Sequence, residues 1–171
     1  EIGQVDMHPM AEKIKERFPA GFIWAKEYAG DIIVHVKKDQ IEDILRFLHE
    51  DPDLDFDMMT EIITVDYPED EERFEVVYQI YSTNKMHRIR VKARVKEDNC
   101  SIDSVTGIWK GADFMEREAF DMMGIRFNNH PDLRRILMPE DYDEGYPLRK
   151  DFPIKGRGWR HTYDFIPKMG Q

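Results

Sequence analysis

Cysteine is almost missing from this sequence, which has only Cys100 among its 171 residues. A single thiol cannot close an internal disulfide, and it cannot supply the set of thiolates that holds an iron-sulfur cluster. We therefore expect the chain to work in a reducing, intracellular compartment. We also expect it to carry no iron-sulfur cluster of its own.

The sequence also lacks the patterns that indicate membrane spans, metal sites and nucleotide sites. No apolar run approaches the roughly 20 residues that cross a bilayer, and no signal-peptide pattern opens the chain. The six histidines form no HExxH motif and no Cys–His pairing, and the glycines form no phosphate-binding loop. The sequence therefore predicts no metal ion, no cofactor and no catalytic residue in this chain.

Basic residues are outnumbered by acidic ones, and the net charge is -10. This balance argues against binding to nucleic acid or anionic lipid, since both attract basic surfaces. The charge is uneven, because residues 1–130 hold 17 basic and 28 acidic residues, whereas residues 131–171 hold eight and seven. Regular periodicity also stops at His130. We predict an α/β domain over 1–130 that ends in a prominent helix, followed by an extended partner-binding tail over 131–171.

Apolar periodicity predicts an α+β fold. A short helix is expected after Pro9, and a second over 39–51, with Asp39 as its N-cap. The buried face of the second helix is expected to consist of Ile41, Ile44, Leu45 and Leu48. Strands are expected over 22–28, 31–37, 56–67, 74–82 and 87–97, the first two as a hairpin and the last three as an antiparallel meander. The result is an α/β sandwich with a mainly antiparallel sheet and two helices on one face.

The strand over 87–97 alternates apolar and basic residues. Its basic face consists of Arg88, Arg90, Lys92, Arg94 and Lys96. We favour a solvated face on which these residues pair with acids from neighbouring strands. A surface for a protein partner is the alternative. Nucleic acid is the least favoured, because this face has no aromatic side chain on which bases could stack.

A third helical signal covers residues 104–124. Ser104 is the expected N-cap, Gly111 a break, and Gly124 the glycine that ends the helix. Within it, Glu116 falls on the apolar side and Phe114 among the charges. A buried carboxylate needs a partner, and the candidates are Arg134, Arg135 and Arg149. A general acid is the alternative reading, but no nucleophile or second base accompanies it.

The segment after His130 is rich in proline and aromatic residues and has no helix or strand period. Residues 141–156, DYDEGYPLRKDFPIKG, place arginine and aromatic side chains on a backbone stiffened by proline. Such side chains are typical of protein interfaces. We predict a partner-binding segment, and a self-packed surface loop is the alternative.

Two blocks of this region resemble a known family. EREAFDMMGIRFNNHPDLRRIL, residues 116–137, is similar to the signature of the 30 kDa subunit, or C subunit, of respiratory complex I and NDH-1 enzymes. MPEDYDEGYPLRKDFP, residues 138–153, resembles the next block of that family, with Tyr146 where histidine is common. The resemblance implies a hydrophilic, cofactor-free subunit in the peripheral arm of a proton-pumping NADH:quinone oxidoreductase.

The same resemblance implies where the chain works and with which partners. Flavin and iron-sulfur clusters would lie in neighbouring subunits, and the partners would include the 49 kDa subunit and the subunit that holds the terminal cluster. The chain would meet the membrane only through the complex, on its cytoplasmic side. Alternatives are the equivalent subunit of a membrane-bound nickel-iron hydrogenase or an F420H2 dehydrogenase. A free-standing ferredoxin-like binding module is the alternative from another class.

The predicted interface residues fall into two groups. The first is expected to lock the tail, or a partner, onto the body and consists of Glu116, Arg117, Glu118 and Asp121. The second is expected to anchor the larger subunit and consists of Arg134, Arg135, Tyr146, Arg149, Asp151 and Phe152. His130, before Pro131, is predicted to be a turn or interface residue.

Overall fold

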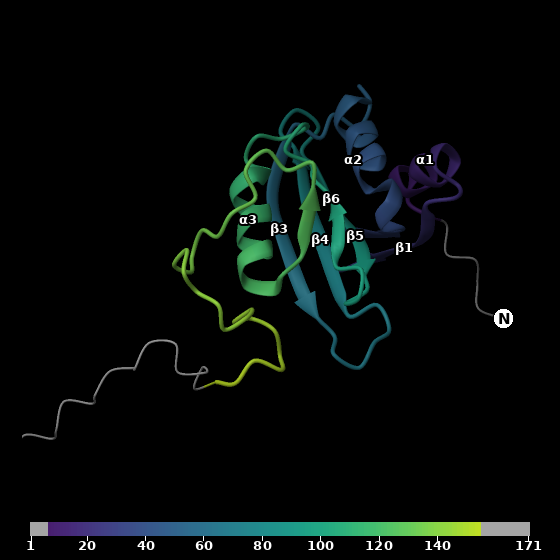
Figure 1. The fold of residues 1–171 in the computed structure, drawn as a ribbon. Helices are drawn as coiled ribbons and strands as arrows, with labels where there is room; N and C mark the ends of the chain where they lie inside the picture. Colours follow the sequence, from purple (N-terminus) through teal and green to yellow (C-terminus); the bar gives the residue numbers. More distant parts are fainter. Residues whose placement is uncertain (1–6, 155–171) are drawn as a thin grey trace, which may run out of the picture.

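The structure is a computed structural model that describes residues 7–154. The chain forms a five-stranded sheet with helices on one side and a long carboxy-terminal segment that runs along α3 (Figure 1). The elements are α1 (Pro9–Arg17), β1 (Phe22–Tyr28), β2 (Asp31–Val36), a 3-10 turn (Lys38–Gln40), α2 (Ile41–Glu50), β3 (Met58–Asp66), β4 (Phe74–Ser82), β5 (His87–Val95), β6 (Ser101–Asp103), α3 (Ala112–Met123) and β7 (Arg126–Asn128). Residues 155–171 of the predicted tail lie outside the described residues.

The strand order of the main sheet is β1-β2-β5-β4-β3. The hairpin β1–β2 turns at Ala29 and Gly30, which both have positive φ, and β3, β4 and β5 form the predicted antiparallel meander. The hairpin and the meander meet where β2 pairs with β5 in parallel. Among the described strands this is the only parallel pair in the main sheet, so the prediction of a mainly antiparallel α+β fold is confirmed.

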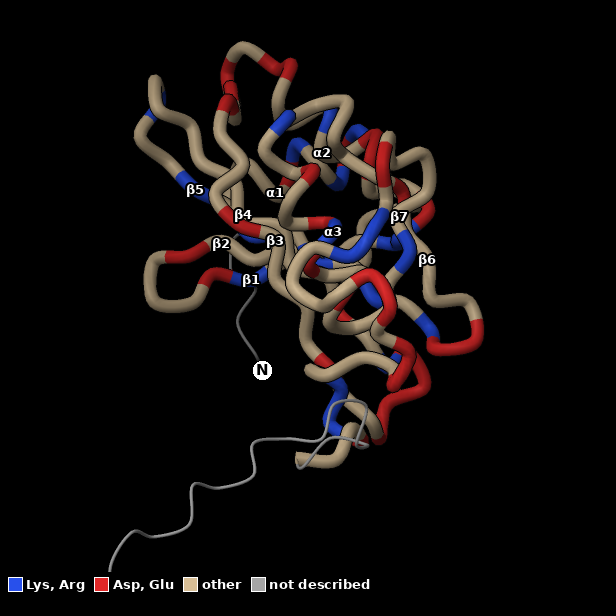
Figure 2. Tube along the Cα trace, turned by 60° about the vertical axis from the view of Figure 1, so that its left-hand side comes forward, with Lys and Arg blue, Asp and Glu red and all other residues tan. Residues whose placement is uncertain are grey.

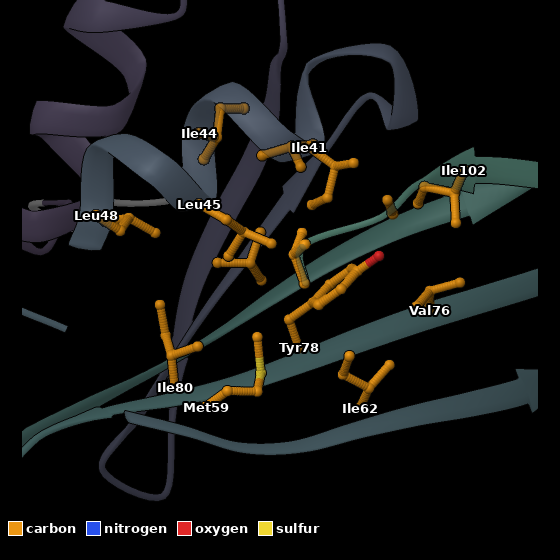
Figure 3. Close-up of a cluster of buried hydrophobic side chains, with 14 of the residues drawn as sticks. Ile41, Ile44, Leu45, Leu48, Met59, Ile62, Val76, Tyr78, Ile80 and Ile102 are labelled. Atoms are coloured by element: carbon orange, nitrogen blue, oxygen red, sulfur yellow. The ribbon is translucent and has the colours of Figure 1, made fainter. Parts of the chain in front are cut away.

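One apolar core lies between the helices and the sheet. The predicted face of α2 is fully buried and packs on inward-facing side chains such as Tyr78 and Ile80 (Figure 3). The helix α1 contributes Ala11 and Ile14, and α3 contributes Ala119 and Met123, to the same cluster. The third helix therefore shares the core of the first two and packs against β3.

Two predicted helix caps are wrong. Asp39 lies inside the 3-10 turn, and Gln40 occupies the N-cap of α2 without a side-chain hydrogen bond. Residues 104–111 form turns rather than a helix, so α3 begins at Ala112 and Ser104 caps nothing. Both caps were predicted from residue type alone. In each case the chain forms a turn first, so the helix begins after the predicted cap. Gly124 ends α3 in the left-handed conformation, as expected.

The outer face of the sheet carries the basic side chains of β5, and each is paired with an acid. Figure 2 shows where the acidic and basic residues lie along the chain. The pairs are Arg88 and Arg90 with Asp31, Lys92 and Arg94 with Glu75, Arg94 also with Asp70, and Lys96 with Glu71. Burial would raise the pKa of Glu75, but contacts with His35, Lys92 and Arg94 outweigh it and lower that pKa to about 2. The predicted cross-strand pairing is confirmed.

Candidate functional site

The candidate site is the junction between α3 and residues 131–154. This segment has turns and bends but no helix or strand, and it runs past α3 toward the corner between β3 and β4 (Figure 1). Proline and glycine prevent regular pairing here, so its backbone must find partners elsewhere. Three attachments to the body provide them.

The first attachment is built on Asp121, whose side chain is completely buried in α3. Its Oδ2 accepts hydrogen bonds from the backbone N–H groups of Ile136, Leu137 and Met138 at 3.0, 2.8 and 2.8 Å, and its Oδ1 accepts one from Arg135 at 2.7 Å. Burial would raise the pKa of Asp121, but these donors outweigh it and hold the pKa below its usual value. One carboxylate thus fixes three consecutive residues of the segment.

Arg117 lies one helical turn earlier in α3 and binds the backbone just before residues 136–138. Its guanidinium donates to the carbonyl oxygens of Arg134 and Arg135, both at 3.2 Å. The Arg135 guanidinium in turn lies over the Tyr142 ring, 5.2 Å from its centroid. Arg117 and Asp121, which lie four residues apart on one face of α3, therefore bind the same stretch of backbone, residues 134–138.

The second attachment is Arg149, which binds the end of α3. Its Nε donates to the carbonyl oxygen of Met123 at 2.8 Å and its Nη1 to Glu97 at 3.1 Å. Its guanidinium lies 4.5 Å from the ring centroid of Tyr146 and 4.7 Å from that of Phe74. A cation between two aromatic faces that also satisfies a helix-terminal carbonyl is a favourable arrangement.

The third attachment is centred on Arg73, at the base of the β3–β4 loop. Its guanidinium binds both carboxylate oxygens of buried Asp66, at 2.8 and 2.9 Å, and reaches Asp151 at 3.0 Å. The hydrogen bond from Arg73, joined by one from the Lys150 N–H, lowers the pKa of Asp66. Bidentate pairs of this kind fix orientation as well as position.

Glu116 is buried, as predicted, but its predicted arginine partner is wrong. Its carboxylate accepts hydrogen bonds from the Ser104 hydroxyl at 2.6 Å and the Val105 N–H at 2.7 Å. Burial raises the pKa of Glu116 to about 7, although these hydrogen bonds act to lower it. The three arginines bind other groups: Arg134 pairs with Asp132, Arg135 with Asp121, and Arg149 with the Met123 carbonyl oxygen and Glu97. Glu116 therefore fixes the loop before α3 rather than the tail.

His130 lies beside Glu116 and closes the loop from the other side. Its side chain is fully buried, with Nε2 3.9 Å from a Glu116 oxygen. Nε2 donates to the carbonyl oxygen of Asp113 at 3.2 Å, and Nδ1 accepts from the Asp132 N–H at 3.0 Å. These contacts make His130 the residue that turns the chain at the start of the segment.

Gly124 is where the segment presses most closely on the body. It has φ +79°, and a Cβ built there would lie 2.5 Å from the Tyr146 ring and 2.8 Å from Arg149. We expect Gly124→Ala to lower the free energy of unfolding by about 1–3 kcal/mol, because a left-handed alanine is strained and the ring must also move. Chemical denaturation of the two proteins measures the difference.

Gly111 offers a matched control for this substitution, because it has φ -65° and no atom within 4 Å of a built Cβ. We expect Gly111→Ala to leave stability unchanged or raise it by up to about 1 kcal/mol. Equal losses at the two glycines would contradict the close packing at Gly124.

The structure brings most of the predicted interface residues to this junction, but they bind the body of their own chain. Arg117, Asp121, Arg135, Tyr146, Arg149 and Asp151 take part in the three attachments. Glu118 is exposed. Within residues 7–154, the Arg134 side chain forms an exposed pair with Asp132, and its backbone carbonyl accepts from Arg117. Phe152 is half-buried. Their role toward a partner stays a prediction.

Asp66, Arg73 and Glu97 belong to the junction but were missed by sequence reasoning, and Ser104 was predicted only as a helix cap. The three charged residues lie in or near an acidic turn, and no local signal links Arg73 to Asp151, 78 residues later in the chain. Within residues 7–154, no group of three or more histidine, cysteine, aspartate or glutamate side chains is placed to hold a metal ion. Over the same residues, no helix is long and apolar enough to cross a membrane.

Sequence comparisons find relatives over most of the chain. Residues 34–158 match the family described as the 30 kDa subunit of respiratory-chain NADH dehydrogenase. The C subunit of an NADH-quinone oxidoreductase from Geobacter sulfurreducens is 46% identical over 145 residues, which cover 84% of this chain and 88% of the relative. The protein of the same name from Roseiflexus sp. is 45% identical over 160 residues, or 94% and 91% of the two chains.

Structural comparisons agree with the sequence comparisons. A trypsin-resistant fragment of Nqo5 superposes with a TM-score of 0.61 and 27% identity, covering 72% of this chain and 99% of the fragment. A chain of the membrane-bound sulfane sulfur reductase, an archaeal respiratory membrane complex, gives a TM-score of 0.69 at 27% identity and covers 85% and 84% of the two chains.

Proposed function

The chain belongs to the family of the 30 kDa subunit of respiratory-chain NADH dehydrogenase, and we propose that it acts there as a structural subunit without a catalytic group of its own. In this proposal it is the C subunit of an NADH-quinone oxidoreductase, in the peripheral arm of that complex. The observation that carries this conclusion is the 46% identity to such a subunit over 84% of the chain. Its role would be to support the assembly of the quinone-reducing module.

Sequence identity to the relatives favours NADH as the electron donor over hydrogen or F420H2. The relatives at 45–46% identity are named as C subunits of NADH-quinone oxidoreductases, whereas the sulfane sulfur reductase chain is 27% identical. The equivalent subunit of a nickel-iron hydrogenase or an F420H2 dehydrogenase is the second candidate. It is favoured only by that structural similarity to a complex with a different activity.

The redox cofactors would lie in partner subunits. Residues 7–154 offer no metal-ligand cluster, and the one cysteine, Cys100, has its pKa raised by burial. A thiol that resists ionisation is a poor ligand. Flavin and iron-sulfur clusters are therefore proposed for neighbouring chains, and quinone reduction for the interface of the 49 kDa subunit with the terminal-cluster subunit.

The junction would present the carboxy-terminal segment to the 49 kDa subunit. Asp121 holds the backbone of residues 136–138, while the side chains of Leu137, Leu148 and Ile154 are 59%, 57% and 106% exposed. An exposed apolar side chain on a fixed backbone loses little entropy on binding. The attachments would thus pre-organise a docking surface, and anchoring by Arg149 and Phe152 stays part of this proposal.

Leu137→Asp is expected to reduce the complex recovered with the tagged chain by roughly tenfold or more, because a charge replaces an apolar contact at a partner surface. Stability of the isolated chain should stay unchanged, since the side chain contacts mainly solvent. Affinity purification followed by subunit quantification measures the loss.

Met86→Asp is the matched control, because Met86 is 74% exposed at the β4–β5 turn. It should assemble like the unmodified protein. Normal assembly of Leu137→Asp would contradict docking through this segment.

Native purification of the tagged chain tests the proposed function itself. We expect a large membrane complex that reduces quinone with NADH. The purified complex should be offered NADH, hydrogen and F420H2 in turn. A complex that uses only hydrogen or F420H2 would establish the second candidate, and a lone chain would establish a free-standing binding module.

A further inference from the structure

Within the described residues, the main sheet has two edge strands, β3 and β1, and they differ in how well they are protected. β3 is the outermost strand, and its outer side pairs with no strand of residues 7–154. From Glu61 to Asp66 it is regular, and this stretch carries no lysine and no proline. Such residues usually protect a free edge against pairing with another chain. The opposite edge strand, β1, has both a lysine, Lys26, and a register shift between Phe22 and Trp24.

A hollow of about 150 Å³ lies between this edge and α3. Its apolar lining is Ile62, Ile63, Ala119, Met122 and Leu148. Ile62, Ala119 and Met122 are buried and form the floor, while Ile63 and Leu148 are 37% and 57% exposed. The hollow is open to solvent on one side and is also lined by Glu61, Thr64 and Glu118, and a space of about this volume is as large as a benzene ring needs. The hollow therefore fits one large apolar side chain.

Two carboxylates lie at the mouth of the hollow. Glu61 is exposed and, among the residues that the structure describes, accepts one hydrogen bond, from Gln79 at 3.3 Å. Glu118 is exposed and makes no hydrogen bond or ion pair with the described part of the chain. This contrasts with the basic strand β5, where each of the five charges is paired. Unpaired acids beside an apolar hollow complement a basic side chain from outside.

We infer that the outer edge of β3 and the hollow beside it form a second docking site, which takes an extended segment of another subunit as an added strand. The segment would carry one large apolar side chain for the hollow and a lysine or arginine beside it for Glu61 and Glu118. Main-chain hydrogen bonds to the edge would supply affinity and the side chains would supply specificity. The inference rests on the proposed function, because it needs an assembled complex.

Site-specific photo-crosslinking in the purified complex tests this inference. A benzophenone amino acid at Ile63 is expected to link to a different subunit. Peptide mapping should place the link in an extended stretch with an apolar residue flanked by lysine or arginine. The same probe at Tyr28, which is 70% exposed on β1, should give no such link.

Charge reversal completes the test. Ile63→Lys and, separately, Glu118→Lys should each lower the crosslink or recovery of that subunit by roughly tenfold, whereas Tyr28→Lys should not. Glu118 is exposed, so its substitution leaves the fold intact and covers the case in which Ile63→Lys perturbs β3.

Three results would overturn the inference. They are an active NADH-oxidising complex with no link at position 63, a link to this chain's own residues, and a link to an acidic or helical stretch. In each of them the proposed function survives. A chain that purifies without any complex would overturn both.

Discussion

Asp121→Ala is expected to detach residues 135–138 from α3 and to lower the free energy of unfolding by about 3–5 kcal/mol. The substitution removes the acceptor of three consecutive backbone N–H groups and the partner of Arg135. These donors would stay partly buried without a partner, which is the costly outcome. Denaturant unfolding gives the loss, and hydrogen exchange of the Ile136, Leu137 and Met138 amides localises it.

Asp132→Ala is the control for that variant, because Asp132 is an exposed carboxylate paired with Arg134. We expect it to change stability by no more than about 0.5 kcal/mol. The pH dependence gives an independent check. Since the folded pKa of Asp121 is lowered, its contribution is present above the unfolded value, about 3.9, and is lost as pH falls through the folded value. Unchanged amide protection in Asp121→Ala would contradict the attachment.

Glu116→Gln is expected to remove a fall in stability that the unmodified protein shows between about pH 4.5 and 7. The folded pKa of Glu116 is raised to about 7 from 4.5, so the folded state binds the extra proton in this window. Stability is therefore highest below the unfolded pKa and declines as pH rises through the folded one, by about 3 kcal/mol. Glutamine keeps an acceptor for the Val105 N–H and cannot ionise.

The difference between the two proteins isolates this one group from its neighbours. His130, Asp113 and Tyr78 face Glu116 from the surrounding elements and are present in both proteins. Unfolding measured at pH 5, 6, 7 and 8 should show the variant gaining on the unmodified protein as pH rises. Glu118→Gln, two residues away and exposed, should follow the unmodified curve. Parallel curves for Glu116→Gln would mean that Glu116 is paired and ionised.

Local periodicity was enough to predict most of the fold. The face of α2 and the alternation of β5 are properties of a few adjacent residues, and tertiary packing uses them as the sequence suggests. The parallel pairing of β2 with β5 could not be read this way, because Val34 and Val91 are far apart in the chain. Which strands pair depends on the relative free energies of all possible pairings, and these cannot be judged from adjacent residues.

The candidate site was predicted in its residue types better than in its contacts. The helical period predicted that Glu116 is buried, but burial of a carboxylate does not reveal which donor reaches it. Ser104 supplies that donor from a turn, where a helix had been expected. Arg73 was missed because its partners lie in three separate segments. Contacts between side chains that are distant in the sequence produce no recognisable spacing of residues in the sequence.

The most direct test of a structural role is NADH-driven quinone reduction by membranes from cells that lack their own copy of this chain. The unmodified chain is expected to restore the activity, Asp121→Ala is expected to restore little of it, and the purified chain alone should oxidise no NADH. Full activity without the chain, or activity in the isolated chain, would contradict a structural role in the quinone-reducing arm.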